Sequence, residues 1–324
     1  MSTKLTEILH FLQKCYCTYE QNRGRGRPNV YSNASMTLFF MVMMLKKIYT
    51  FKAMAKYAKE HYEDYGFPKA PSRKTIRRRF IALPDCIHWL MPQIAKECIE
   101  LDFPKFKCSW TFVDKTIFRA LGGLWHKKHM KEGIVPHPSI DTDASWGYSP
   151  YHKWRFGYGL HVLCLQNRFP IAAWATTAST KDHSIMDKLL VFLHGLVGIV
   201  VGDMGYRCIK SIEQLYNQFG VLLQTPKAFS SYLSKPFVKM YNALITTVQA
   251  RALYRHRKPS VEPVFSLIKH IFSLEGEKQL PYRGLGYVST FLMICPLTIQ
   301  LMIRDNYLNN RDWATNHAFL NQIK

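Results

Sequence analysis

The fold is decided by the stretch Trp-Thr-Phe-Val-Asp-Lys-Thr-Ile-Phe at residues 110–118. Its aromatic and β-branched residues predict a buried strand, and Asp114 interrupts that strand. A carboxylate in the middle of a buried strand is unfavourable unless something binds it, and it has no local capping role there. Asp114 is therefore the first candidate for a functional residue.

Two further acidic residues stand at the ends of predicted elements. Asp203 follows the apolar run 198–202, so it should emerge at the carboxyl end of a strand. Glu262 lies in the first turn of a helix predicted to start near Pro259. Each has a structural alternative, because an aspartate before Met-Gly-Tyr suits a turn and a glutamate early in a helix complements its dipole.

The elements around these acids predict a mixed α/β sheet. Ser179 and Asp182 suit a capping box for a helix through Leu196, and the strand after that helix should pair in parallel with the first strand. A closing apolar run without charges at 286–303 predicts a buried C-terminal helix. Strands are predicted at 110–118, 120–124, 156–165, 169–177, 198–202 and 221–225, with a loop at 126–153 and a helix at 207–219. This order describes a ribonuclease-H-like mixed sheet flanked by helices.

The first hundred residues show no strong strand signal and predict an all-helical domain, 1–100, ahead of a second domain, 101–324. Residues 22–29 interrupt the helices with Arg-Gly-Arg-Pro, whose Arg25 and Arg27 resemble an AT-hook that enters a narrow minor groove. A plain basic linker is the open alternative.

A basic helix follows a predicted helix at 51–65 that Gly66 closes. Ser72 is a good N-cap, and Ile76 and Phe80 fall on one face of the second helix. The pair suits a helix-turn-helix with the second helix in a major groove, the alternative being a solvated surface helix. The basic face of this second helix consists of Arg73, Lys74, Arg77 and Arg78.

The net charge of the chain points to a polyanionic partner. Lys and Arg total 44 against 22 Asp and Glu, which gives +22. Double-stranded DNA is favoured over an anionic membrane, because the segments that carry the charge suit DNA recognition. Eight cysteines without paired spacing, and a start without a long apolar stretch, indicate a cytoplasmic, nucleoid-associated protein without a membrane span.

Taken together, the three acids suit a metal site. Asp114 on the central strand and Asp203 at the end of its parallel neighbour should lie side by side, and Glu262 should enter from a helix packed across the sheet. Hard oxygen ligands in a cluster suit Mg²⁺ or Mn²⁺, and three carboxylates can hold two such ions.

At this point the chain resembles a known family, the bacterial insertion-sequence transposases of the DDE type with a Y-R-E-K signature. Asp114-Lys115-Thr116 resembles that family's Asp-x-Thr, and Asp203-Met204-Gly205-Tyr206 matches its Asp-x-Gly-Tyr. Glu262, followed seven positions later by Lys269, matches the Glu and Lys of the signature. The strand Gly157-Tyr158-Gly159-Leu160-His161 is similar to a Gly-Tyr-Lys-Leu-His strand of the group.

The basic part of the signature departs from the family pattern. Its Arg position holds Lys258 and its Tyr position holds Arg255, while Tyr254 and Arg257 are each one residue away. The resemblance implies that Arg255, Lys258 and Lys269 contact DNA.

The resemblance further implies a homodimeric transposase on DNA. Such an enzyme binds the terminal inverted repeats, cleaves the strands at the ends, and transfers the 3′-hydroxyl into target DNA with two metal ions held by Asp114, Asp203 and Glu262. Two alternatives stay open from the residues alone. One is an inactive or domesticated DNA-binding relative, and the other is a nuclease of this fold that cuts without joining.

Overall fold

The N-terminal part is helical, as predicted. The computed structural model describes residues 3–21, 30–100, 110–149, 153–276 and 278–323. Side chains of Ser32, Thr50 and Ser72 accept backbone N–H groups at the starts of three helices, and Gly66 ends the short helix η1 with φ of 64°. The helices are α1 (Thr3–Gln21), α2 (Asn33–Leu45), α3 (Phe51–His61), η1 (Glu63–Tyr65), α4 (Arg73–Ile81) and α5 (Leu83–Glu100).

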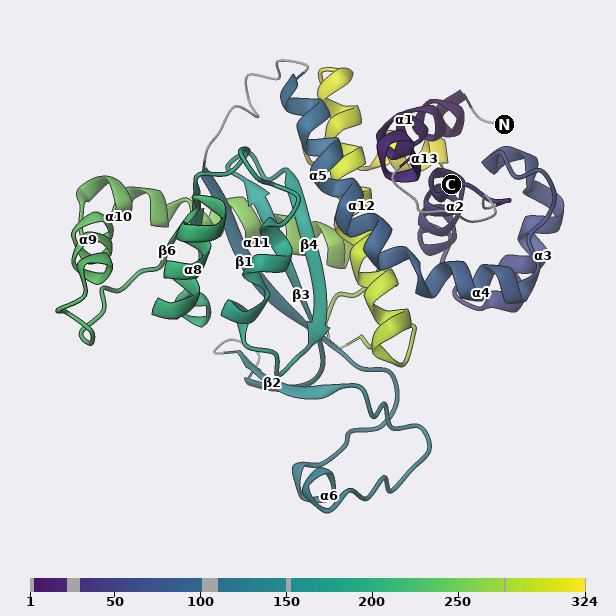
Figure 1. The fold of residues 1–324 in the computed structure, drawn as a ribbon. Helices are drawn as coiled ribbons and strands as arrows, with labels where there is room; N and C mark the ends of the chain where they lie inside the picture. The colour runs from purple at the N-terminus through teal and green to yellow at the C-terminus, as the bar shows by residue number, and fades with distance from the viewer. Residues whose placement is uncertain (1–2, 22–29, 101–109, 150–152, 277, 324) are drawn as a thin grey trace.

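A mixed sheet forms the centre of the molecule, and its order confirms the predicted ribonuclease-H-like topology. The strands run in the order β2-β3-β1-β5-β6, with β4 paired to β3 (Figure 1). β3 is antiparallel to β1, β2 and β4, whereas β5 is parallel to β1 and β6 is parallel to β5. Their bounds are β1 (Trp110–Arg119), β2 (Ser145–Ser149), β3 (Lys153–Leu165), β4 (Pro170–Thr177), β5 (Ile199–Val201) and β6 (Leu222–Gln224).

The predicted strand at 120–124 is wrong, because the chain turns there. Gly122 has φ of 97°, and its N–H donates to Gln279 Oε1 instead of a strand partner. The predicted loop at 126–153 is also more ordered than expected, since it contains helix α6 (Lys127–Glu132) and strand β2. Figure 1 shows α6 and the loop around it projecting away from the sheet, whereas β2 pairs with β3.

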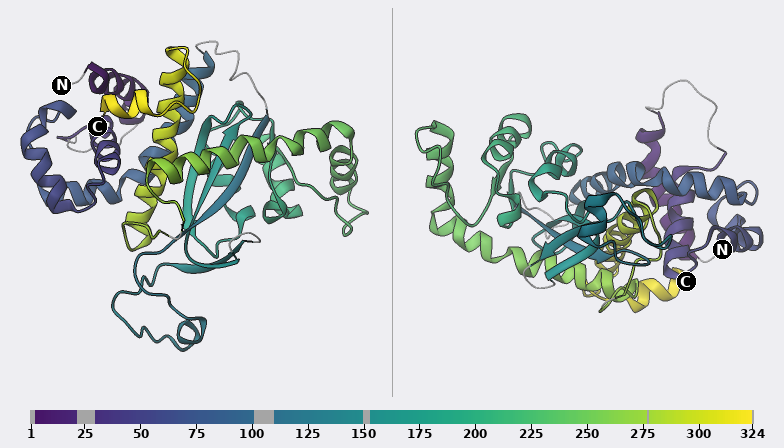
Figure 2. Two further views of the ribbon diagram at one scale, coloured as in Figure 1. Left: turned by 180° about the vertical axis from the view of Figure 1, so that it is seen from behind. Right: turned by 90° about the horizontal axis from the view of Figure 1, so that it is seen from below.

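Helices cover both faces of the sheet. Figure 2 shows α11 running across one face, while α7 and α8 lie on the other (Figure 1). The predicted helix through Leu196 is wrong in length, because it consists only of η3 and the five-residue α7. These helices are η3 (Asp182–Ile185), α7 (Met186–Leu190), η4 (Met204–Tyr206), α8 (Ile209–Phe219), α9 (Pro236–Ile245), α10 (Val248–Arg255), α11 (Arg257–Ile271), α12 (Leu285–Leu308) and α13 (His317–Ile323).

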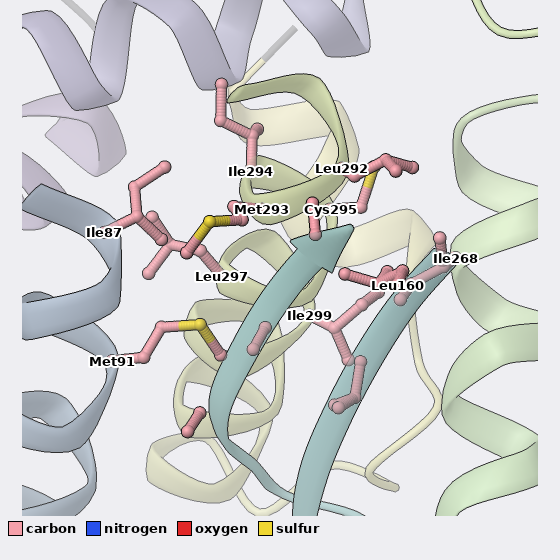
Figure 3. Close-up of a cluster of buried hydrophobic side chains, with 14 of the residues drawn as sticks. Ile87, Met91, Leu160, Ile268, Leu292, Met293, Ile294, Cys295, Leu297 and Ile299 are labelled. Carbon is pink, nitrogen blue, oxygen red and sulfur yellow. The ribbon is translucent and has the colours of Figure 1, made fainter. Parts of the chain in front are cut away.

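Helix α12 is the predicted buried C-terminal helix, and it joins the N-terminal helices to the sheet. Its Met293 and Leu297 lie beside Met91 of α5, with Leu160 of β3 and Ile268 of α11 nearby (Figure 3). Burying an aliphatic side chain of this size contributes about 1.5–3 kcal/mol, so this layer holds the two parts together. The helix is long and apolar enough to cross a membrane, but 83% of its most apolar window is buried inside the protein.

Candidate active site

Strand pairing brings Asp114 and Asp203 together. The parallel ladder of β1 and β5 ends where Phe112 is opposite Val201, and Asp114 and Asp203 each follow two residues later, so both residues come at the same end of the ladder. Both side chains are partly exposed. The charge of Asp203 acts on Asp114 and disfavours its ionisation, which is the expected effect of two neighbouring carboxylates.

The carboxylate of Asp114 is held by two donors. Its Oδ2 accepts from Nη1 of Arg257 at 2.6 Å, and its Oδ1 accepts from the backbone N–H of Lys115 at 2.9 Å. Burial nevertheless raises the pKa of Asp114 to about 6, with Arg257 opposing the rise and Asp203 adding to it. The ionised form of Asp114 is therefore unfavourable in this site without additional positive charge.

Asp203 also adopts the turn-forming role that its sequence suggested as an alternative. Its Oδ1 accepts the backbone N–H of Gly205 at 2.8 Å, which caps η4 directly after β5. One carboxylate oxygen is thus committed to the turn. The turn and a ligand role are compatible, because a carboxylate offers two oxygens.

Tyr206 of η4 links this turn to the sheet through hydrogen bonds. Its hydroxyl is 3.0 Å from Nδ1 of His161, and Nε2 of the same ring is 3.2 Å from Oγ1 of Thr176. Burial, assisted by the charge of Lys115, lowers the pKa of His161 well below its ordinary value. The imidazole is consequently neutral and serves as a fixed hydrogen-bonding bridge between η4 and β4.

Lys115 and Asp182 form a second buried pair on the opposite side of β1 from Asp114. The Nζ of Lys115 donates to the carbonyls of Ala178 and Thr180 at 2.9 Å and to Oδ1 of Asp182 at 3.0 Å. The predicted capping box is therefore wrong, because Asp182 binds Lys115 and caps no helix. Burial raises the pKa of Asp182, against the opposing effect of Lys115.

Two glycines make room for this pair. A Cβ at Gly159 would lie 2.7 Å from Cε of Lys115, and one at Gly205 would collide with the carboxylate of Asp182. The transposase family that the chain resembles often has a lysine at the position of Gly159. Here the glycine leaves space for Lys115 of the neighbouring strand β1. Asp182 and Lys115 were not predicted as neighbours of the site, because Asp182 had a plausible local role as a helix cap and its partner is 67 residues away.

Glu262 does not join the two aspartates in this structure. It is exposed in the second turn of α11, because the helix begins at Arg257 and not near Pro259. Within the described ranges, no three His, Cys, Asp or Glu side chains are close enough to hold a metal ion together. The structure thus brings together two of the three predicted carboxylates.

Arg257 is the basic side chain that reaches the site. Lys258 and Arg255 are exposed, whereas Arg257 is buried against Asp114. The signal was present in the sequence, since Tyr254 and Arg257 have the spacing of the signature but are shifted by one residue. Lys269 lies on nearly the same side of α11 as Glu262, and burial together with Arg155 lowers its pKa.

The predicted helix-turn-helix consists of α3 and α4. Ile76 and Phe80 are buried, and the face of α4 with Arg73, Lys74, Arg77 and Arg78 is exposed. One of these residues also docks the helix, because Nε of Arg77 donates to the hydroxyl of Tyr287 at 2.5 Å. Arg25 and Arg27 lie outside the described residues.

The chain belongs to the DDE transposases. The family model described as the transposase DDE domain matches residues 110–297, which is more than half of the chain. The protein is therefore a DNA transposase, an enzyme that cleaves and joins DNA with divalent metal. This match assigns the chain to the DDE transposases. The likeness to the group with the Y-R-E-K signature remains a resemblance of sequence motifs.

Solved transposase structures are similar to this chain only at a distance. A piggyBac transposase synaptic complex with hairpin DNA has a TM-score of 0.44 and 9% identity, and the match covers 99% of this chain and 76% of that one. A Mos1 transposase paired-end complex has a TM-score of 0.22 and 11% identity, with 74% and 79% covered. A search of curated proteins found no match.

Proposed function

We propose that Asp114, Asp203 and Glu262 are the catalytic residues and metal ligands of this transposase. In the proposed reaction the enzyme hydrolyses the DNA strands at the ends of its transposable element. The freed 3′-hydroxyl then attacks target DNA. The observation that supports the proposal is the parallel pairing of β1 and β5, whose last pair, Phe112 and Val201, comes two residues before Asp114 and Asp203.

The chemistry of the donor set fits a hard divalent cation. Two neighbouring carboxylates supply oxygen ligands, and the raised pKa of Asp114 reflects a site that favours added positive charge. When bound, two Mg²⁺ or Mn²⁺ ions activate the attacking oxygen and stabilise the leaving oxygen of the phosphodiester. Glu262 completes the set in this proposal through a change at α11 that accompanies DNA binding.

Arg257 has two roles in the proposal. It neutralises Asp114, and if a bound cation took over that role its guanidinium, whose fork of donors suits phosphate, would be able to bind a DNA phosphate. Exposed Arg255 and Lys258 and the partly buried Lys269 lie on or next to the same helix. We assign them to contacts with the DNA backbone.

The N-terminal helical domain, residues 1–100, recognises the element ends in the proposal. Arg73, Lys74, Arg77 and Arg78 bind the terminal inverted repeats through the major groove, and Arg25 and Arg27 contact the minor groove. Residues 101–324 form the catalytic domain. Because two ends must be processed together, we propose a homodimer on DNA that acts inside the cell.

The test compares three variants with a matched control. Asp114→Asn, Asp203→Asn and Glu262→Gln are assayed with Mg²⁺ on DNA that contains the genomic flanks of the coding sequence. Each variant should lose cleavage and keep DNA binding, whereas Asp187→Asn, at an exposed aspartate of α7, should retain both. Cleavage at the original rate in Asp114→Asn contradicts the assignment.

A second assay separates transposition from cleavage alone. A DNA end that is already cut, with a free 3′-hydroxyl, is incubated with supercoiled plasmid and Mg²⁺. The proposal expects joined products with the wild type and none with Glu262→Gln. Cleavage without joining identifies a nuclease of this fold, and binding without cleavage identifies an inactive relative.

A further inference from the structure

The tip of the β2–β3 hairpin carries a pair of exposed aromatic side chains with a lysine on one of them. Tyr148 and Trp154 are opposite each other in the β2–β3 ladder, and their rings meet edge to face at 5.4 Å. Both are more than half exposed. The ammonium of Lys127, at the start of α6, lies 3.3 Å from the centre of the Trp154 ring, so the lysine is held in place.

The surroundings of this pair are positively charged. Lys127, Lys128 and Lys131 are exposed on α6, and Lys153 is exposed beside Trp154. Two aspartates of the segment bind the body of the protein instead. Oδ2 of the buried Asp141 accepts from the hydroxyl of Tyr158 and the N–H of Gly284, and Oδ2 of the exposed Asp143 accepts from the N–H of Leu285. Glu132 at the end of α6 is an exposed acid, so the three lysines of α6 outnumber it and the helix keeps a positive charge.

The hairpin tip lies on the same face of the sheet as the candidate active site. Asp114 pairs with Val162 of β3, and Trp154 is eight residues before Val162, so the even spacing puts both on one face. At about 3.3 Å per residue the separation is about 26 Å, which corresponds to about eight base pairs of duplex DNA.

Basic side chains lie between these two points. Lys269 is twelve residues along α11 from Arg257, hence about 18 Å from the residue that contacts Asp114. It is close enough to Arg155 of β3, next to Trp154, for that charge to lower its pKa. Arg257 and Lys269 thus lead along α11 away from the site, whereas Arg155, at an odd spacing from Val162, lies on the other face of β3.

We propose that the lysines of α6 and the hairpin, with Lys127 positioned by Trp154, bind the phosphate backbone of duplex DNA about eight base pairs from the phosphodiester that is cut. The proposal rests on the proposed function, because the distance is counted from Asp114. The charge of the surface selects a polyanion, and the span matches a straight duplex that leaves the active site.

Binding is measured without metal, on duplexes of different reach. The short duplex ends about four base pairs from the cut on both sides. Two long duplexes each extend about twenty base pairs from the cut, one on one side and the other on the opposite side. At low salt Lys127→Ala and Trp154→Ala should each weaken binding of one long duplex about three- to tenfold and leave the short duplex unchanged. Lys127→Arg should retain binding, and the double variant should match Lys127→Ala, because Trp154 acts through the lysine.

The control is Lys188→Ala, which removes another exposed lysine that lies over a tryptophan, Trp174, at 5.1 Å. It should bind every duplex like the wild type. Unchanged affinity of Lys127→Ala for all long duplexes, or an equal loss on short and long ones, overturns the proposal. Cleavage of the long duplexes by the wild type in the presence of Mg²⁺ reports on the proposed function separately.

Discussion

Nη1 of Arg257 lies 2.6 Å from Oδ2 of Asp114, and only 8% and 16% of their side-chain surfaces are exposed. An ion pair this buried gains little net stability by itself, but the loss of one partner leaves an uncompensated charge. The pair therefore couples the beginning of α11 to the central strand, and its energetics are open to measurement.

Asp114→Asn should make the stability of the metal-free protein less dependent on pH. Burial raises the pKa of Asp114 to about 6, from 3.8 ordinarily. A raised folded-state pKa means that this residue's contribution to stability is complete below pH 3.8 and is lost as the pH rises through 6. The wild type should therefore lose about 3 kcal/mol between pH 3.5 and pH 7 that the variant does not lose. The variant leaves Arg257 without its anion at both pH values, so that cost cancels in the comparison. Chemical unfolding with chelator at the two pH values measures the difference, with Asp187→Asn as the control, and an equal effect of Asp114→Asn at both pH values contradicts it.

Arg257→Ala should destabilise the metal-free protein at pH 7.5, by on the order of 3 kcal/mol, because it leaves Asp114 buried without its cation. The loss should be smaller when Asp114 is already Asn. A double-mutant cycle by urea unfolding measures this coupling, expected at about 1–3 kcal/mol. Arg251→Ala, at an exposed arginine of α10, should change stability little. Additive losses in the cycle mean that the two residues do not act as a pair.

Strand pattern and order were predictable from the sequence where local signals were strong. The apolar runs at 110–118 and 198–202 each contain one strand of the sheet. Their apolar pattern predicted the strands, and the helix expected between them predicted that the strands pair in parallel. The strand at 120–124 was mispredicted because its apolar residues lie next to Gly122, whose positive φ ends the ladder. Composition alone does not distinguish a short apolar turn from a short strand.

The candidate site was predictable at Asp114 and Asp203 because strand register fixes backbone positions. Arg257 stands at the signature's spacing from Tyr254, but the sequence alone did not select it over Lys258, because one residue of shift turns a helical side chain by about 100° and decides whether it enters the site. The role of Asp182 was not predictable either, because the sequence offered it a plausible local role as a helix cap. Its partner Lys115 is 67 residues away, and only the tertiary fold brings the two together.

Gly205→Ala should impair cleavage without preventing DNA binding. The added methyl group would collide with the carboxylate of Asp182, which Lys115 holds in place, so the turn that presents Asp203 must shift. A loss of at least about tenfold in the cleavage rate is expected, because misplacement by about 1 Å is costly at a reacting centre. Gly286→Ala is the control, since its methyl would meet Ile81 only at an ordinary 3.6 Å. Wild-type cleavage by Gly205→Ala shows that Asp182 does not position the turn.

Lys115→Met should lower stability while leaving the aspartate pair in place. The substitution keeps most of the side-chain volume but removes three hydrogen bonds and leaves the buried Asp182 without its cation. A loss of on the order of 3 kcal/mol is expected. Adding Asp182→Asn should restore part of it, because the unpaired charge is then gone. Thermal unfolding of the two variants checks both expectations, and an undiminished loss in the double variant contradicts the pairing.

The basic face of α4 should control recognition of the element ends. Arg78→Ala removes an exposed charge from this face without touching the buried Ile76 and Phe80. If Arg78 contacts a phosphate, affinity for all duplexes should fall alike and the slope of log affinity against log salt should decrease by about one. If it contacts a base, discrimination between end and unrelated DNA should decrease by about 1–3 kcal/mol. Titration of both DNAs at several salt concentrations distinguishes these results, and Arg251→Ala serves as the charge-matched control. Unchanged affinity, slope and discrimination in Arg78→Ala exclude Arg78 from the DNA contact.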